Sequence, residues 1–499
     1  MRKWAIGAGV AAAAWLGLSG LASAATPCGG LTAQVLQHAT VTAAADTPAG
    51  QLSACKLEVT ARPSADSDIR IEVWIPDRAA WNGRYVQLGN GGFAGRIDSK
   101  RLEALAAQGY AAAMTDDGHE AEPTDARWAA GHPQKVIDFG WRALKETTTA
   151  AKALITAYQG GPARYAYFQG CSNGGREALM EAQRFPDDFD GIIAGAPGYN
   201  LTGLLTSWAN DLQALTQAQG YLDADALKVL ETGALAACGG GAKYIADPAT
   251  CRFAPHDMAC PRGQANADCL TPGQVATAET IYAGLPGKSP YPGHAPGAEA
   301  ERGSWAMWIS GPSPDQLHQA LIYRFAAGFW GGMVFGDPAY DVLGLDVAKA
   351  PQQAESLAKT LNATDPDLGR FRKRGGKLIQ YHGWNDPAIP AAGSVVYYEQ
   401  VQKKSGGNVD PFFRLYLIPG MLHCGDGPGP SDVAWLGVMR AWVEQNQAPD
   451  VIVATSAPGA PAAKQALCPY PATGAMVGDR AQCMSVSIVA PPPPPPNAS

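Results

Sequence analysis

The chain of 499 residues has few charged side chains and no excess of basic ones. Charged residues make up 17% of the sequence, and the formal net charge is −7 at neutral pH. Because nucleic-acid-binding surfaces need clustered lysine and arginine, this composition argues against nucleic acid as a partner. The hydrophobic fraction of 46% is typical of globular proteins and excludes a largely disordered chain.

Two further patterns are missing from the sequence. It has no C-x-x-C pair and no histidine-rich stretch, so a zinc site is not expected. Beyond the N-terminus, no apolar stretch is long enough to span a bilayer. We therefore expect a protein that needs no cofactor and is not held in a membrane once its leader has been removed.

The N-terminus has the pattern of an export signal. Arg2 and Lys3 precede an apolar stretch at residues 4–21, which ends in small residues at 22–24. This pattern predicts a signal peptide over residues 1–24 that is cleaved before Ala25; the alternative is a membrane anchor. The even number of cysteines agrees with export to the periplasm or the medium, where disulfides form. The ten cysteines are Cys28, Cys55, Cys171, Cys238, Cys251, Cys260, Cys269, Cys424, Cys468 and Cys483.

Strand-like and helix-like segments alternate in the first 197 residues. Such alternation predicts an α/β fold with a mostly parallel sheet covered on both faces. The expected strands are residues 69–75, 84–88, 110–114, 164–168 and 192–194, followed much later by 378–381 and 412–418, with a helix at 138–158. The intervening segment is rich in Gly, Pro, Ala and grouped aromatic residues, which indicates an inserted domain. We expect one domain in two parts, 25–200 and 371–488, an insertion at 201–370, and an extended Pro-rich tail at 489–499.

The motif Gly170-x-Ser172-x-Gly174 lies between an expected strand and an expected helix. A nucleophilic serine needs a sharp turn there, and glycines two residues to either side allow the strand and helix to approach closely. The helix N-terminus behind Ser172 supplies backbone donors for a developing oxyanion. The alternative interpretation is a plain glycine-rich turn.

An acid and a histidine should follow Ser172, each on a loop after a strand. Asp386 follows the strand ending at Tyr381, and His423 follows the strand ending at Ile418. These positions predict His423 as the general base and Asp386 as the group that orients it. Rival candidates are less well placed: Asp426, Asp341 and Asp346 for the acid, and His382 for the base.

Seven segments resemble the tannase and feruloyl esterase family of α/β-hydrolases. They occur at residues 89–95, 115–119, 138–140, 170–177, 182–186, 382–386 and 419–424, and together they span nearly the whole mature chain. The resemblance implies a serine esterase with Ser172, Asp386 and His423 as its triad. It implies a lid domain in place of the insertion, and a bridge between Cys171 and Cys424. For the other cysteines we expect pairing in sequence order: Cys28–Cys55, Cys238–Cys251, Cys260–Cys269 and Cys468–Cys483.

The resemblance also bears on the oxyanion hole and on calcium. The backbone N–H of Asn173 and one of Gly91 or Gly92 are the expected oxyanion donors, although the two glycines could form a plain turn. Family members carry several calcium-binding aspartates between the first two lid cysteines. Here only Asp247 lies between Cys238 and Cys251, and calcium prefers six to eight oxygen ligands, so we expect no metal.

The resemblance implies esters of aromatic acids as substrates: feruloyl, hydroxycinnamoyl or galloyl esters first, and a terephthalate monoester as the alternative. Candidate substrate-binding residues are Trp384, Phe329 and Arg324, the last for a ring hydroxyl or distal carboxylate. Two other classes remain open. A serine peptidase can use the same triad order, and a non-catalytic secreted binding protein would usually lack one triad member. The sequence does not indicate the oligomeric state.

Overall fold

The computed structural model describes residue 1 and residues 26–484, apart from 262–266, 288 and 458. All but the first residue of the predicted signal peptide, and the whole predicted Pro-rich tail, lie outside the described residues. Within the described part of the chain, no helix is both long enough and apolar enough to cross a bilayer.

A nine-stranded sheet forms the centre of the fold, in the order β1-β2-β3-β5-β4-β6-β7-β8-β9. The six strands from β5 to β9 in this order run parallel, whereas β1, β2 and β3 join them through antiparallel pairs. The expected α/β-hydrolase fold with a mostly parallel sheet is therefore confirmed. The strands are β1 (Ala39–Ala49), β2 (Leu52–Ala61), β3 (Ile69–Pro76), β4 (Arg84–Leu88), β5 (Ala111–Thr115), β6 (Tyr165–Cys171), β7 (Gly191–Gly195), β8 (Lys377–Gly383) and β9 (Phe413–Ile418).

Helices cover both faces of this sheet. Alternate residues of a strand point to opposite faces, so the apolar side chains of the strands pack against helices on both sides. In β3, Ile71 and Val73 face one core while Trp74 faces the other. The helices on the first face are α3 (Ala143–Gln159), α4 (Asn173–Arg184) and α12 (Ala392–Lys404). The helices on the second face are α1 (Ser99–Ala106) and α13 (Trp435–Gln445).

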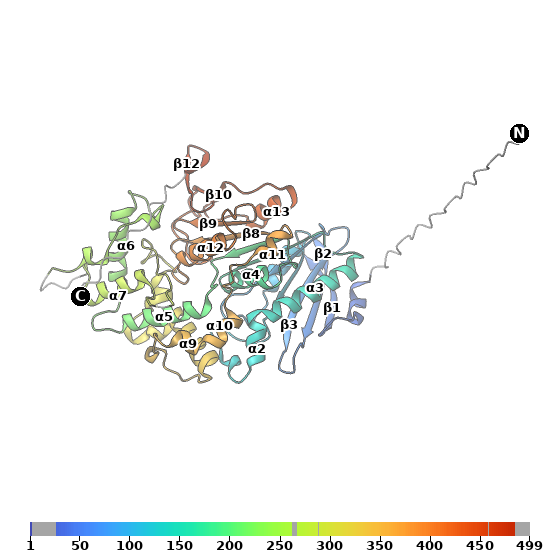
Figure 1. Cartoon of the computed structure of the whole chain (residues 1–499), viewed down its shortest axis with the longest axis horizontal. Helices are drawn as coiled ribbons and strands as arrows, with labels where there is room; N and C mark the ends of the chain where they lie inside the picture. Colours follow the sequence, from blue (N-terminus) through green and yellow to red (C-terminus); the bar gives the residue numbers. More distant parts are fainter. Residues whose placement is uncertain (2–25, 262–266, 288, 458, 485–499) are drawn as a thin grey trace.

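Residues 196–376 lie between the neighbouring strands β7 and β8 and build a separate apolar core. Their main helices lie at the opposite end of the molecule from β1 and β2 in Figure 1. Phe93 and Phe139 of the first part of the chain pack into the same core, so the insertion is anchored on the segments that follow β4 and β5. The main helices are α5 (Leu201–Leu215), α6 (Ala224–Cys238), α7 (Pro272–Ala283) and α8 (Leu321–Ala327), the last continued by a π-helical segment at Gly328–Phe335.

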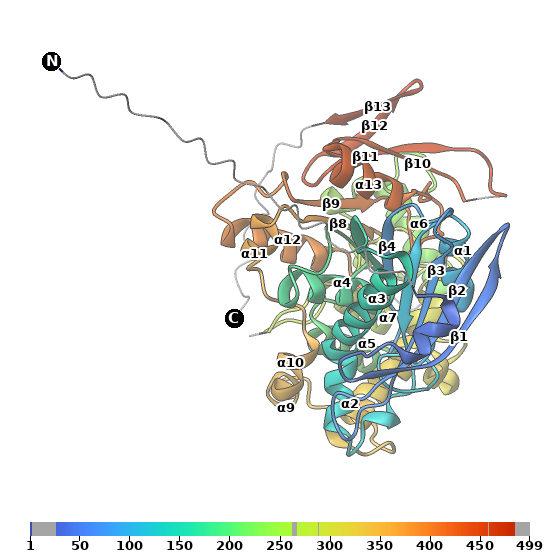
Figure 2. The ribbon, with the colours of Figure 1, turned by 90° about the vertical axis from the view of Figure 1, so that its right-hand side faces the viewer.

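Two small hairpins follow α13 in the described part of the chain. They are β10 (Ile452–Thr455) with β11 (Lys464–Leu467), and β12 (Thr473–Val477) with β13 (Arg480–Met484). Figure 2 shows β12 and β13 projecting at the top of the molecule, beyond α13. Neither these hairpins nor β1 and β2 were among the expected strands.

Candidate active site

The turn between β6 and α4 holds Ser172 in a strained backbone conformation. Its φ of 65° and ψ of −122° lie where residues other than glycine rarely occur, at a cost of about 1–3 kcal/mol. The amide of Ser172 donates to the carbonyl of Gly195 at 3.0 Å. A Cβ atom at Gly175 would lie 2.1 Å from that same oxygen, and one at Gly170 would lie 2.4 Å from the carbonyl oxygen of Gly174. Glycine is therefore required at Gly170 and Gly175 for the strand and helix to meet at this sharp turn.

Asp386 and His423 follow the neighbouring strands β8 and β9, and His423 Nδ1 lies 2.8 Å from Asp386 Oδ2. The other carboxylate oxygen accepts the amides of Ala388 and Ile389 at 2.8 and 2.9 Å. Burial alone would raise the pKa of Asp386, but the charge of His423 and hydrogen bonds from His382 and His423 hold this pKa well below its ordinary value. Asp386 is therefore ionised at neutral pH, and it favours the His423 tautomer that has its proton on Nδ1 and a free Nε2.

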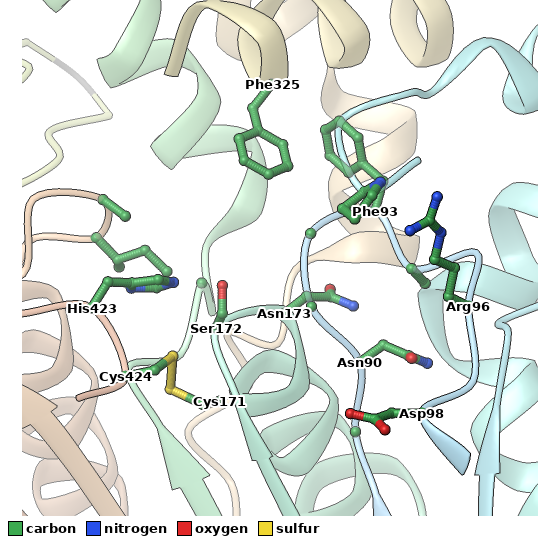
Figure 3. A pocket seen from close by; sticks show the side chains of 18 of the residues that line it. Asn90, Phe93, Arg96, Asp98, Cys171, Ser172, Asn173, Phe325, His423 and Cys424 are labelled. Carbon is green, nitrogen blue, oxygen red and sulfur yellow. A yellow bond between two sulfur atoms is a disulfide. The ribbon is translucent and has the colours of Figure 1, made fainter. Parts of the chain in front are cut away.

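Ser172 and His423 line the same cavity, which has a volume of about 850 Å³. Figure 3 shows the ring of His423 pointing toward Ser172 across the cavity floor. The residues next to them, Cys171 and Cys424, are joined by a disulfide with their Cα atoms 6.0 Å apart. This bond limits the distance between the two segments that carry the serine and the histidine.

The remaining cysteines form four more disulfides in sequence order. No cysteine in the described part of the chain is free. The four bonds are Cys28–Cys55, Cys238–Cys251, Cys260–Cys269 and Cys468–Cys483.

His382, the rival base, is a second partner of the acid. Its Nε2 lies 3.2 Å from Asp386 Oδ2 and 2.9 Å from the carbonyl oxygen of Ile389, while its Nδ1 lies 2.7 Å from Ser394 Oγ. The ring is completely buried and does not line the cavity. A side chain so enclosed cannot reach Ser172, and its contacts fix the loop that carries Asp386.

The rival acids lie outside the cavity. Asp341 caps a short 3-10 helix through the amide of Leu343, and Asp346 pairs with Lys349 on the surface of the insertion. Asp426 is exposed and also does not line the cavity. Asp386 is therefore the carboxylate that contacts His423.

Gly91, Gly92 and Asn173 all line the cavity beside Ser172. Asn173 is the first residue of α4, so its N–H belongs to the helix N-terminus, where backbone donors are unpaired. Gly92 has a φ of 58°, and a Cβ there would lie 2.5 Å from the carbonyl oxygen of Pro123. This position therefore requires glycine. The structure brings all three predicted oxyanion residues to the cavity that Ser172 lines.

Aromatic rings form the wall of the cavity opposite the serine. Phe325, on α8, is at the centre of this wall, with its ring 5.2 Å from that of Phe93, 5.7 Å from Trp208 and 6.3 Å from Trp308. The Trp308 ring also lies 5.0 Å from His423. The insertion thus places apolar aromatic rings on the side of the cavity that faces Ser172, as Figure 3 shows for Phe325.

The three expected substrate-binding side chains do not line this cavity. Trp384 faces a second cavity of about 740 Å³ on the side of the β10–β13 hairpins. Phe329 is fully buried against Trp330, and Arg324 is exposed. Because neighbouring residues of a helix point about 100° apart, α8 directs Phe325 into the cavity and Arg324 away from it.

Several residues that line the cavity were not expected from the sequence. Phe93 lies within the Gly-rich segment quoted for the family resemblance, and that position was its available signal. Trp208 lies in the middle of α5 and carries no motif. A basic segment before and within α1 also lines the cavity, with Arg96, Lys100 and Arg101.

The Cys238–Cys251 loop does not fit the family's calcium site. Asp247 is its single acidic residue, and calcium sites need several carboxylates. Among the described residues, no group of three or more His, Cys, Asp or Glu side chains could hold a metal ion. Whether the protein is independent of calcium remains a prediction.

The comparisons with known proteins find ester hydrolases. Residues 55–487 match the family model described as tannase and feruloyl esterase. The chain is 37% identical to an uncharacterized esterase of Xanthomonas campestris, over 92% of this chain and 90% of the relative. It is 31% identical to a mono(2-hydroxyethyl) terephthalate hydrolase of Piscinibacter sakaiensis, over 81% of this chain and 78% of the relative.

Solved structures are similar over almost the whole chain. The feruloyl esterase B of Aspergillus oryzae superposes with a TM-score of 0.83 at 26% identity, covering 92% of this chain and 99% of the other. The tannin acyl hydrolase of Aspergillus niger has a TM-score of 0.73 at 23% identity, covering 93% of this chain and 94% of the other, and supports the fold alone.

Proposed function

The chain belongs to the tannase and feruloyl esterase family of ester hydrolases, and from this premise we propose that it is an exported serine esterase acting on esters of aromatic acids. The observation that carries the proposal is the 2.8 Å contact between His423 Nδ1 and Asp386 Oδ2, on loops that bring His423 into the cavity of Ser172. Export is supported by the five disulfides and the N-terminal leader pattern.

The proposed reaction proceeds through an acyl-enzyme. His423 Nε2 takes the proton of Ser172 Oγ as that oxygen attacks the ester carbonyl carbon. The N–H groups of Asn173 and of Gly91 or Gly92 bind the resulting oxyanion. His423 then passes its proton to the departing alkoxide, and water hydrolyses the acyl-enzyme by the same two proton transfers. Asp386 stays ionised throughout and stabilises the imidazolium.

The aromatic wall supports the substrate class. A flat acyl ring stacked on Phe325 or Trp308 would gain about 0.5–1.5 kcal/mol beyond the burial of its area. Feruloyl, hydroxycinnamoyl or galloyl esters are the first candidates. A terephthalate monoester is the alternative, favoured by the Piscinibacter sakaiensis relative.

The mechanism is tested by substitution and by labelling. Ser172→Ala should lower kcat by several orders of magnitude with an unchanged circular dichroism spectrum. Ser456→Ala, which changes a half-buried serine just after β10 and outside the cavity, is the matched control. A fluorophosphonate reagent should add once to the wild type, on the peptide that contains Ser172. Turnover near the wild-type rate in folded Ser172→Ala would reject the proposal.

The substrate class is tested by a panel of four methyl or ethyl esters: ferulate, gallate, terephthalate monoester and butyrate. We expect the highest kcat/KM for one of the aromatic esters. Phe325→Ala should reduce the advantage of the aromatic esters and leave butyrate nearly unaffected. A preference of the wild type for butyrate would contradict the aromatic assignment.

A further inference from the structure

A fully buried polar network lies directly behind the proposed oxyanion donors. Glu177, on α4, is completely buried. Its Oε2 accepts the amide of Asn90 at 2.9 Å, and its Oε1 accepts Asn173 Nδ2 at 2.6 Å. Asn90 leads directly into Gly91, and Asn173 follows Ser172. One carboxylate therefore ties together the two segments that supply the oxyanion donors.

The amide side chain of Asn173 is held at both of its ends. Its Oδ1 accepts Arg176 Nε at 2.7 Å, while its Nδ2 donates to Glu177. The Arg176 guanidinium is buried as well, lies over the ring of Phe139, and donates to the carbonyl oxygens of Phe139, Gly140 and Leu361. Rotation of Asn173 would break these contacts, so the network fixes the first residue of α4.

A second buried carboxyl group, that of Asp117, meets Glu177 in this network. Asp117 follows β5 with a φ of 61°, which costs a non-glycine residue about 1–2 kcal/mol. Neither of its oxygens accepts a hydrogen bond from any N–H or hydroxyl donor of the described residues. The carboxyl group of Glu177 is its neighbour in this buried site, and the two carboxyl groups can share a hydrogen bond. Two carboxyl groups can form such a bond only if one of them carries a proton.

The environment indicates which of the two holds this proton. Burial raises the pKa of Asp117 well above its ordinary value, and Glu177 raises it further. Burial also raises the pKa of Glu177, but hydrogen bonds from Asp117, Asn90 and Asn173 and the charge of Arg176 oppose this effect. Asp117 is therefore the neutral donor, and Glu177 is the acceptor of three hydrogen bonds.

We propose that Asp117 and Glu177 are positioning residues that share one proton and hold the oxyanion hole in its working geometry. The inference rests on the proposed function, because it concerns the donors that would stabilise the tetrahedral intermediate. With the proton in place, Glu177 keeps Asn90 and Asn173 together. Loss of the proton leaves two anions side by side in a buried site, and their repulsion pulls the two donor segments apart.

Among the described residues, four other titratable groups lie near the pair: Arg176, Asp116, Glu181 and His119. Burial lowers the pKa of His119 to about 4, so this ring is neutral at neutral and alkaline pH. The charge of Arg176, on α4, favours ionisation of the two carboxyl groups. Asp116, the neighbour of Asp117, and Glu181, one turn further along α4, oppose ionisation when they are charged. Burial raises the pKa of Asp116 to about 7, so its charge adds to the repulsion in the alkaline range. The test must therefore change Asp117 itself.

The test compares kcat and KM across pH for the wild type and variants, using one aromatic ester. Asp117→Ala should lower kcat about tenfold with little change in KM, and Asp117→Asn should restore most of that loss, because its amide also donates to Glu177. The kcat of the wild type should fall in the alkaline range, and that of Asp117→Asn should not. Glu177→Gln should lower kcat about a hundredfold, as expected for a displaced oxyanion donor. Glu355→Gln, which changes an exposed glutamate that does not line the cavity, should behave as the wild type.

A spectroscopic measurement keeps the inference testable if Asp117→Ala does not fold. The infrared difference between the wild type and Asp117→Asn at neutral pH should contain the carbonyl stretch of a protonated carboxylic acid. Absence of that band, an unchanged alkaline limb in Asp117→Asn, or wild-type kcat in Glu177→Gln would each overturn the inference. Ser172→Ala distinguishes the two levels: activity in that variant defeats the proposed function, whereas its inactivity together with any of these results defeats only the positioning role.

Discussion

Cys171 and Cys424 are joined by a disulfide across 253 residues of sequence, so the residue before Ser172 is covalently tied to the residue after His423. Ser172 and His423 come from distant parts of the chain and from strands β6 and β9, which are separated in the sheet by β7 and β8. Without the bond, their relative position would depend on the packing of two turns at the cavity floor.

Removal of this disulfide should affect both stability and catalysis. In Cys171→Ala/Cys424→Ala the free energy of unfolding should fall by up to about 5 kcal/mol, because the unfolded chain regains a long open loop. The kcat should fall about a hundredfold, since a shift of one ångström between reacting groups can cost that much. Calorimetry and ester hydrolysis measure the two effects. Cys468→Ala/Cys483→Ala, which opens the disulfide between the residue after β11 and β13, is the control and should keep its kcat. Equal kcat in both double variants would contradict the prediction.

Asp386→Asn should remove the carboxylate that orients His423 and leave His423 itself in place. The amide favours the wrong tautomer of His423, so we expect kcat to fall by about 10⁴ with the fold intact. The pKa of Asp386 is lower in the folded protein than its unfolded value of about 3.9, so its ionised form stabilises the fold above that pH and this contribution is lost as the pH falls below it. Between about pH 5 and 3 the wild type should therefore lose more stability than the variant in urea unfolding. Parallel losses would show that the carboxylate is not specifically stabilised.

Chelation tests the interpretation of the Cys238–Cys251 loop. The loop offers one acidic side chain, Asp247, and its ends are closed by a disulfide, so we expect its structure to need no metal. Incubation with a chelator, followed by removal of the chelator, should leave kcat and Tm unchanged. A fall in Tm that calcium restores and magnesium does not would show that this expectation is wrong.

The central strands and the candidate triad could be predicted because local patterns carry them. The alternating Ile69, Ile71, Val73 and Ile75 predicted β3, and the glycines around Ser172 predicted the turn. By contrast, β1 contains five alanines and three threonines with mostly exposed side chains, so its sequence has little hydrophobic alternation. It forms a strand because it pairs along its whole length with β2.

The substrate cavity was harder to predict, because its walls come from segments that meet only in the folded chain. Phe329 and Phe325 are one helical turn apart and equally aromatic, but Phe329 packs into the core of the insertion while Phe325 faces the cavity. The contact between the carboxyl groups of Asp117 and Glu177 was not predicted from the sequence either. Asp117 and Glu177 lie in separate motifs, and their contact depends on the approach of the β5 end to α4.

The basic segment that lines the cavity leads to a prediction about substrate charge. Lys100 and Arg101 are exposed on α1, and among the described residues neither side chain has an ion-pair partner. The neighbouring Arg96 pairs with Glu122, and Asp98 accepts the amide of Arg101. The cavity is therefore more basic than acidic at this end, whereas the exposed Arg324 that was expected to bind a carboxylate does not line it.

An aromatic ester that carries a carboxylate away from the scissile bond should have a lower KM than its matched neutral methyl ester. Exposed ion pairs contribute about 0.2–1 kcal/mol, so the expected ratio of KM values is about 1.5 to 5 at low salt. It should shrink as added salt screens the charges. Lys100→Ala/Arg101→Ala should abolish the difference with little change in kcat for the neutral ester. Lys373→Ala/Lys403→Ala removes the same charge from exposed positions outside the cavity and should preserve it. The prediction is wrong if the charged and neutral esters have equal KM values at low salt. It is also wrong if the ratio of KM values is unchanged in Lys100→Ala/Arg101→Ala, because this basic segment then does not bind the substrate carboxylate.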